Sequence, residues 1–300
     1  MHLDTESLRT FVTVLNTGGM TSAAKELNLS QSAVSWKIKR LEERIGRDLL
    51  IRDGRSLRPS RDGQELLRYA RPIVDMHDEA VARMSSSELS GRLRLGATEE
   101  VSAEVVGKVL GRFNRIHTSV VIDVIVDRAF RLEELLDRGE LDIALLQVSE
   151  QDHRKDDTLL WQDDEVWICA PAWTYDDGVV PLVTFGEHGF YRPLAEELLA
   201  DAGIDFRTGF SGPSTASLLA AVEAGFGVAL LSSRSVTGRV IEWPRSELLA
   251  DPGVVQQVAR AAPGPRSEIV VELIANLTAE LGEFSAGLDG VSASPDVEIV

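Results

Sequence analysis

The residues best suited to do chemistry in this sequence are polar side chains at the start of one predicted helix. Residues 30–46 read SQSAVSWKIKRLEERIG, and their apolar positions recur at helical spacing: Val34, Ile38, Leu41 and Ile45. With about 100° of rotation per residue, these four form a single apolar stripe. The polar side chains near the start of the segment are Gln31, Ser32 and Ser35. Side chains of these types can hydrogen-bond to base edges in the major groove of DNA.

Each of these polar residues has its own expected partner. Gln31 can make paired hydrogen bonds to an adenine. For Ser32, contact with a base and simple initiation of the helix are equal alternatives. Lys39 and Arg40 lie farther along the helix, where the phosphate backbone is the expected partner.

Trp36 lies on the face opposite the apolar stripe, where a large aromatic side chain is not expected. On a DNA-facing surface, its ring could contact a thymine methyl group or a sugar edge. The alternative is packing against a neighbouring protein surface, such as the following hairpin or another protomer. Trp36 is therefore a candidate residue for selecting the DNA sequence of the operator.

Short helices and a hairpin are expected to position these residues. Helical patterns precede residue 30, Thr21 is the expected N-cap of the second helix and Ser30 that of the third. Only three residues separate the second and third helices, which predicts a helix-turn-helix. The following LLIRDGRSLRPS predicts a β-hairpin, or wing, around Asp53 and Gly54.

The wing carries three arginines that are candidates for contact with phosphate or the minor groove: Arg52, Arg55 and Arg58. For Arg52, the alternative is a surface ion pair with Asp48 or Asp53. We therefore place a DNA-binding domain at residues 1–60.

The charge distribution separates this domain from the rest of the chain. The formal net charge is −17, which argues against a nucleic-acid partner if it is spread evenly. Residues 1–90, however, hold 14 of the 31 Lys and Arg residues and 13 of the 48 Asp and Glu residues. The N-terminal part is therefore slightly basic and the remainder strongly acidic, so a polyanion is expected to bind the N-terminal part.

A long helix with one apolar edge is predicted at residues 61–90, which also include a polar hinge. Its edge residues are spaced alternately by four and three, as in a coiled-coil seam: Leu66, Ala70, Ile73, His77, Ala80 and Met84. Such an edge indicates a dimerisation helix, with Ser60 as its expected N-cap.

Strands and helices alternate beyond residue 90, which predicts an α/β fold with a parallel sheet covered by helices. Residues 288–300 are expected to be an acidic, disordered tail. Cys169 lies in the apolar run VWICAP and is expected to be a buried strand thiol.

Over about sixty residues, the helices, wing and long helix closely resemble the winged helix-turn-helix and linker helix of LysR-type transcriptional regulators. The segments GRLRLGA, GELDIALLQV and AAVEAGFGVALL resemble the effector-binding module of that family. The segments QSAVS, GATEEV and FSGPSTASLLAAVEAG are most similar to the branch that contains LrhA, HexA and PecT.

The resemblance implies two α/β subdomains, residues 91–161 with 267–287 and residues 162–266, similar in fold to periplasmic binding proteins. Ligands bind α/β sheets beyond the carboxyl ends of strands, here in the cleft between the subdomains. The candidate effector-binding residues are Thr98, Glu99, Glu100, Arg128, Gln147, Ser214 and Thr215. Glu99 and Glu100 oppose an organic acid, which leaves an effector with cationic or hydrogen-bond-donor groups, or no small molecule. Their alternative role is a favourable interaction with a helix dipole.

The resemblance further implies a homodimer paired through the long helix, or a homotetramer, on an interrupted inverted repeat of double-stranded DNA. Effector-driven bending of the DNA would alter access for RNA polymerase. No cofactor is expected, and the five histidines show no metal spacing.

The rival classes are a periplasmic solute-binding protein and an enzyme. The sequence shows no signal peptide and no membrane span, so we expect a cytoplasmic protein rather than a periplasmic one. Against an enzyme, no catalytic triad or phosphate-binding loop is recognisable. The acidic run Asp163, Asp164 and Glu165 is expected to be solvated rather than to bind a metal.

Overall fold

The computed structural model describes residues 3–53, 56–85, 89–174, 178–187 and 189–281. The chain divides into two compact units. One contains residues 1–88, with Arg112–Thr118 grouped with it, and the other contains Leu89–Gly111 and Ser119–Gly282. The predicted tail at 288–300, the end of the predicted first subdomain beyond 281, and Arg55 lie outside the described residues.

Three short helices begin the N-terminal unit: α1 (Thr5–Asn16), α2 (Met20–Glu26) and α3 (Gln31–Ile45). The Ser30 side chain accepts a hydrogen bond from the Ala33 amide at 3.2 Å, so the predicted cap of α3 is confirmed. The predicted cap of α2 is wrong, because that helix begins at Met20 after Gly19 and Thr21 lies inside it. Gly46 ends α3 in the left-handed conformation, at φ 75°.

The predicted apolar stripe of α3 forms part of the N-terminal core. Val34, Ile38 and Leu41 are buried there with Leu8 and Phe11 of α1. Burying this stripe forces the opposite face of α3 outward, which leaves Gln31 and Trp36 exposed.

The predicted wing is the antiparallel pair β1 (Leu50–Asp53) and β2 (Ser56–Pro59). Glu42 of α3 fixes its approach by accepting a hydrogen bond from the Leu49 amide at 2.8 Å. At the far end of the wing, the Ser60 hydroxyl accepts from the Gly63 amide at 2.9 Å and caps the next helix. A Cβ at Gly63 would lie 2.0 Å from the Leu49 carbonyl oxygen, so only glycine fits this crossing.

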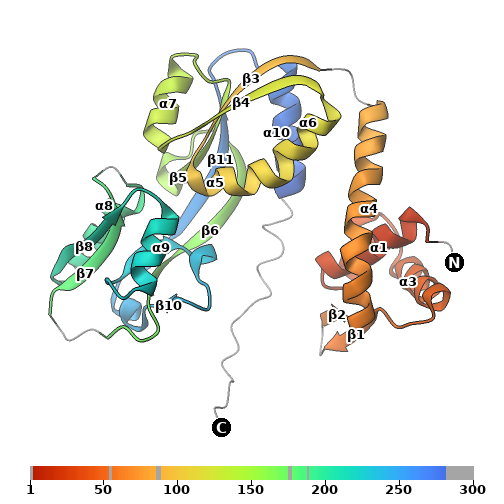
Figure 1. Cartoon of the computed structure of the whole chain (residues 1–300), viewed down its shortest axis with the longest axis horizontal. Helices are drawn as coiled ribbons and strands as arrows, with labels where there is room; N and C mark the ends of the chain where they lie inside the picture. Colours follow the sequence, from red (N-terminus) through yellow and green to blue (C-terminus); the bar gives the residue numbers. More distant parts are fainter. Residues whose placement is uncertain (1–2, 54–55, 86–88, 175–177, 188, 282–300) are drawn as a thin grey trace, which may run out of the picture. The chain divides into compact units, whose positions relative to one another are not determined.

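Helix α4 (Arg61–Ser85) is 25 residues long, and the other elements of the N-terminal domain lie beside its first part (Figure 1). Part of the predicted seam is buried against the N-terminal core and part of it is exposed. Ala70 is buried in the N-terminal core and Leu66 packs against that core, whereas Ile73 and Met84 are exposed. The exposed apolar stripe of α4 consists of Tyr69, Ile73, Met76, Ala80 and Met84.

The first subdomain of the larger unit contains a β-α-β-α-β series, and α10 (Glu268–Leu281) also packs on it. Its elements in chain order are β3 (Ser90–Ala97), α5 (Glu99–Val105), the π-helical turn η1 (Val106–Leu110), β4 (Ser119–Val126), α7 (Ala129–Asp137) and β5 (Ile143–Ser149). Between η1 and β4 the chain forms α6 (Gly111–Ile116), which is grouped with the N-terminal unit from Arg112 onward. The helical segment between β3 and β4 is thus interrupted by the π-helical turn. Strand β3 pairs in parallel with both β4 and β5, as predicted.

The second subdomain has its own strands and helices: β7 (Val180–Phe185), α8 (Tyr191–Asp201), β8 (Phe206–Gly212), α9 (Thr215–Glu223), β9 (Ala229–Ser232) and β10 (Ile241–Glu242). Strands β7 and β8 are parallel, and β9 and β10 pair antiparallel with β6 (Thr158–Cys169). Short 3₁₀ turns lie at Glu150–Asp152, Ser233–Ser235 and Pro244–Leu248.

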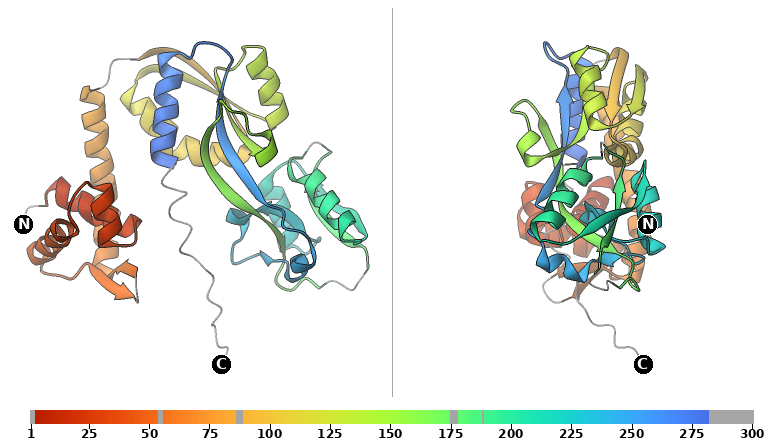
Figure 2. Two further views of the ribbon diagram at one scale, coloured as in Figure 1. Left: turned by 180° about the vertical axis from the view of Figure 1, so that it is seen from behind. Right: turned by 90° about the vertical axis from the view of Figure 1, so that its left-hand side faces the viewer.

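Strands β6 and β11 (Val254–Ala261) belong to both subdomains (Figure 2). They pair antiparallel with each other, and β11 also pairs antiparallel with β5. The sheet is therefore mixed: the β-α-β-α-β series is parallel, as predicted, whereas β11 returns to the first subdomain in the opposite direction. The expected boundary at 161/162 falls inside β6.

The acidic run on β6 was also misjudged. The pleat alternates its side chains, so Asp163 and Glu165 are buried and only Asp164 is exposed. Cys169, at the end of the same strand, is a buried free thiol as predicted, and burial raises its pKa.

Candidate DNA-binding face and ligand cavity

The outward face of α3 carries every residue that the sequence placed there for DNA contact. The exposed side chains are Gln31, Ser32, Ser35, Trp36, Lys39 and Arg40. Ser32 is also close to the capping hydroxyl of Ser30, with 2.9 Å between the two oxygens. Both alternatives for Ser32, helix initiation and base contact, are therefore compatible with its position.

Trp36 is 57% exposed, and the Arg40 guanidinium lies over its ring at 4.9 Å from the centroid. This is a cation–π arrangement between residues one helical turn apart. It presents a flat apolar surface and a positive charge side by side on the α3 face.

In the wing, Arg52 and Arg58 are exposed. Among the described side chains, Arg52 makes no ion pair, and in particular none with Asp48, whereas the side chain of Asp53, the other expected partner, lies outside the described part of the structure. Its guanidinium is available to a phosphate. Neighbouring Lys37 and Arg44 are instead tied to acidic residues of the N-terminal unit, Glu6 and Asp4.

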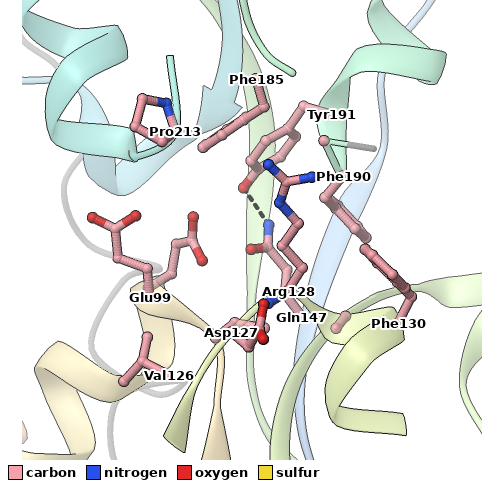
Figure 3. Close-up of a pocket in the computed structure, with 14 residues that line it drawn as sticks. Glu99, Val126, Asp127, Arg128, Phe130, Gln147, Phe185, Phe190, Tyr191 and Pro213 are labelled. Carbon is pink, nitrogen blue, oxygen red and sulfur yellow. Dashed lines mark hydrogen bonds between the residues drawn. The ribbon is translucent and has the colours of Figure 1, made fainter. Parts of the chain in front are cut away.

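A cavity of about 490 Å³ opens in the larger unit (Figure 3). Both subdomains line it, with the following residues: Thr98, Glu99, Glu100, Val126, Asp127, Arg128, Ala129, Phe130, Gln147, Phe185, Gly189, Phe190, Tyr191 and Pro213. Its size falls in the range of small-molecule sites.

Five of the seven predicted effector residues line this cavity, and the other two lie beside it. Glu99 and Glu100 begin α5 at the end of β3, and Arg128 precedes α7 at the end of β4. The carboxyl ends of neighbouring parallel strands meet at one edge of the sheet, which brings these residues together. Ser214 and Thr215 are not lining residues, although Pro213 is.

Thr215 donates hydrogen bonds to the two glutamates that line the cavity. Its amide donates to Glu99 Oε2 at 3.3 Å, and its hydroxyl donates to Glu100 Oε1 at 2.8 Å. Partial burial raises the pKa of Glu99, and the nearby charge of Glu100 adds to that rise, while the Thr215 amide opposes it. These bonds hold two like charges close together at one wall of the cavity.

Tyr191 and Gln147 form a buried polar contact in the cavity. Gln147 is buried, and its Nε2 donates to the Tyr191 hydroxyl oxygen at 2.5 Å, drawn as the dashed line in Figure 3. Burial first, and then the carboxylates of Glu100 and Glu165, raise the pKa of Tyr191 far above its usual range. Its hydroxyl therefore remains a neutral hydrogen-bond donor.

Sequence reasoning missed the aromatic part of the lining. Phe185, Phe190 and Tyr191 come from the end of β7 and the start of α8, and Phe130 from the first turn of α7. A strand followed by a glycine-bearing loop and a helix, VVPLVTFGEHGFY, is the pattern that could have indicated them.

A buried charged group lies on β6. Asp163 pairs with Arg234 and accepts a hydrogen bond from Trp161 Nε1 at 3.0 Å. Glu165 is only 6% exposed, and burial raises its pKa to about 7.

The described residues contain no cluster of three or more His, Cys, Asp or Glu side chains that could hold a metal ion. Within that same part of the chain, no helix has the length and apolar composition needed to cross a membrane.

An exposed helix-turn-helix face and a ligand-sized cavity in an α/β unit together define the class of DNA-binding regulator with an effector domain. Two family models match in the corresponding places. Residues 5–64 match the bacterial regulatory helix-turn-helix protein of the lysR family, and residues 86–278 match the LysR substrate binding domain. The chain belongs to the LysR-type transcriptional regulators, and its function is that of a DNA-binding transcriptional regulator with an effector-binding domain.

Two curated relatives span most of the chain. The HTH-type transcriptional regulator PecT of Dickeya dadantii (strain 3937) is 31% identical over 233 residues, which are 77% of this chain and 73% of PecT. The regulator DgdR of Burkholderia cepacia is 28% identical over 237 residues, 78% of this chain and 79% of DgdR. The similarity to PecT agrees with the expected branch of the family.

Solved structures share the fold. CrgA, a LysR-type transcriptional regulator from Neisseria meningitidis, superimposes with a TM-score of 0.52 at 22% identity, covering 94% of this chain and all of that one. DarR from Vibrio fischeri, solved in complex with DNA, gives a TM-score of 0.51 at 18% identity, covering 93% of this chain and 99% of that one. The expected fold, a helix-turn-helix domain followed by two α/β subdomains, is confirmed.

Proposed function

We propose that the outward face of α3 reads an operator in the major groove while the wing contacts the phosphate backbone or the minor groove. The observation that carries this proposal is the opposition of the two α3 faces. Val34, Ile38 and Leu41 are buried, whereas Gln31 and Trp36 point outward. A recognition helix needs this division, because one face must pack on the domain while the other enters the groove.

The phosphate contacts and the base contacts have separate roles in this proposal. Arg52, Arg58, Lys39 and Arg40 supply sequence-independent affinity, and Arg55 of the wing is assigned the same role from its place in the sequence. Gln31, Ser32, Ser35 and Trp36 supply selectivity. Affinity should therefore fall with salt, and selectivity should depend on the α3 residues.

We propose a homodimer paired through the exposed apolar stripe of α4, with a homotetramer as the higher assembly. Met76 and Tyr69 are 71% and 65% exposed, and Ile73 lies between them on the same face. Such a stripe on a soluble helix is stabilised by burial against a second copy. A two-fold dimer presents two α3 helices and so matches an interrupted inverted repeat.

We propose that a small molecule in the cavity modulates DNA binding or DNA bending, and thereby access for RNA polymerase. Support comes from the placement of the cavity, since residues of both subdomains line it and a ligand there would bind both. The proposed action is binding rather than catalysis, in the cytoplasm, where the DNA partner is found.

The proposed function is tested by gel-shift titration of the full chain on the DNA upstream of its own gene. We expect a selective complex whose affinity falls steeply as salt rises. Affinity that is equal for this DNA and for scrambled DNA of the same composition would contradict the proposal.

A further inference from the structure

We propose that the cavity binds an α-amino acid with an apolar side chain, with the ammonium group at Glu99 and Glu100 and the carboxylate at Arg128. This inference rests on the proposed function, because it names the ligand class of the same cavity. It is carried by the separation of opposite charges on the cavity wall, by an unpartnered buried hydroxyl, and by the aromatic part of the lining.

The acidic wall has acceptors left over for an ammonium group. Thr215 occupies Oε2 of Glu99 and Oε1 of Glu100. Among the described residues, the second oxygen of each carboxylate has no hydrogen-bond partner. Thr98 also lines the cavity, is 5% exposed, and its Oγ1 has no partner in the described part of the chain. The two remaining carboxylate oxygens therefore supply acceptors for N–H donors of an ammonium group, and the Thr98 hydroxyl is a buried polar group beside them that still lacks a partner.

The basic wall is Arg128, which precedes α7. Within the described residues its guanidinium forms no ion pair, although it faces an acidic cavity. Figure 3 shows the guanidinium extending toward Tyr191, across the open space from Glu99. A planar guanidinium is the side chain best matched to a ligand carboxylate.

The start of α7 adds a second carboxylate-binding feature. Helix α7 has nine residues and no side-chain cap, and Ala129 and Phe130 of its first turn line the cavity. The Ala129 amide lies at the positive end of this helix, where no side chain caps it. Asp127 accepts from the Arg128 amide at 2.8 Å and lines the cavity too. With three carboxylates and one guanidinium, the lining disfavours a ligand that carries only a carboxylate.

Another part of the cavity lining is apolar. Phe130, Phe185 and Phe190 line it together with the ring of Tyr191. A side chain that buries apolar surface against these rings gains affinity, and the rings also favour a nearby ammonium group. A zwitterion with an apolar side chain satisfies both charged walls and this surface at once.

The experiment is calorimetric titration of the full chain with L-leucine, L-phenylalanine and L-tryptophan. Each is compared with its amine, which lacks the carboxylate, and with its carboxylic acid, which lacks the amine. We expect at least one amino acid to bind at least about 10-fold more tightly than both of its counterparts, since each loses one charged contact. Absence of binding by all three at millimolar concentration, or equal binding by an amine or an acid, overturns the inference.

Variants then assign the two walls. The Glu99→Gln/Glu100→Gln double variant keeps acceptors for Thr215 and removes charge, so it should weaken the amino acid at least about 10-fold and the carboxylic acid not at all. Arg128→Gln should weaken the amino acid by a similar factor and leave the amine unaffected. Glu242→Gln and Arg131→Gln are exposed controls outside the lining and should change nothing. Equal losses for amino acid, amine and acid in either variant would contradict the assignment.

Gel shifts with the same proteins separate this inference from the proposed function. Selective DNA binding without amino-acid binding refutes only the ligand class. Amino-acid binding without selective DNA binding refutes only the regulatory role.

Discussion

Arg40 stacks over the ring of Trp36, with 4.9 Å between the guanidinium carbon and the ring centroid. The stack holds both side chains against the α3 surface, so less conformational entropy is lost when they meet DNA. The Arg40 guanidinium can therefore contact a phosphate while the flat Trp36 ring contacts a base.

Replacing Trp36 with alanine should therefore reduce affinity for the operator about 10-fold, and affinity for unrelated DNA much less. Gel-shift titrations on both DNAs at one salt concentration measure the difference. Trp36→Phe keeps an aromatic plate and should retain part of the selectivity. Equal operator binding by the wild type and Trp36→Ala would exclude a groove role, and the dimer should be unchanged in every case.

A charge on the exposed α4 stripe should disrupt pairing. Met76→Glu places a carboxylate in the proposed interface, and an unpaired buried charge costs several kcal/mol, so we expect about a 100-fold or greater rise in the dimer dissociation constant. Gln64→Glu adds the same charge at an exposed position on another face of α4 and should leave the dimer intact. Sedimentation equilibrium measures both. An unchanged dimer in Met76→Glu would place the interface elsewhere.

Glu165 makes stability depend on pH. Burial raises its pKa to about 7, whereas the unfolded chain keeps an ordinary value. Between those two pKa values only the folded state holds the proton, so the free energy of unfolding falls as pH rises through about 5 to 7. A shift of this size corresponds to about 3 kcal/mol at pH 8.

Glu165→Gln should remove that loss, raising the free energy of unfolding by about 1 to 3 kcal/mol at pH 8 with little change at pH 5. Asp164→Asn, at the exposed neighbouring position, is the control and should have little effect at either pH. Urea denaturation at both pH values gives the comparison. The same gain at pH 5 and pH 8 would show that proton uptake is not the cause.

Arg260 should stabilise the protein mainly by neutralising the carboxylates that it contacts, rather than by packing. Its Nε and Nη2 donate to the two Asp157 oxygens at 2.7 and 2.6 Å, and its Nη1 pairs with Glu133. The Asp157 side chain is 1% exposed, so Arg260→Met leaves a buried charge unpaired and should cost about 3 to 5 kcal/mol.

Adding Asp157→Asn to Arg260→Met should recover much of that loss, because no buried charge remains. Arg239→Met removes an exposed arginine whose ion pair with Glu223 spans 3.4 Å, and should cost at most about 1 kcal/mol. Thermal unfolding of the four proteins measures these differences. No recovery in the double variant would mean that Arg260 stabilises the fold by packing.

The parts of this fold that sequence predicted are those set by local periodicity and capping. The α3 stripe and the Ser30 cap depend on residues within two or three turns, and so does the wing about its turn. The direction of β11 was not predictable in this way, because β5 and β6, its neighbours in the sheet, are about a hundred residues away in sequence.

The cavity shows the same limit. Thr98, Glu99, Glu100, Arg128 and Gln147 follow strands that could be recognised, and the rule for strand ends placed them correctly at one edge. The aromatic residues from the second subdomain needed the positions of both subdomains. Burial of Glu165 was likewise hidden, since an acidic run gives no indication of which side of a strand will be covered.

Strands β6 and β11 are the two places where the chain passes between the subdomains, and they are hydrogen-bonded to each other. Any change in the angle between the subdomains must therefore twist or bend this pair of strands, because neither crossing contains a loose linker. The paired strands resist opening and closing of the subdomains alike, because both movements deform them. A ligand that bridges the cavity changes the preferred angle between the subdomains. Part of the free energy of its contacts is then spent on deforming the two strands.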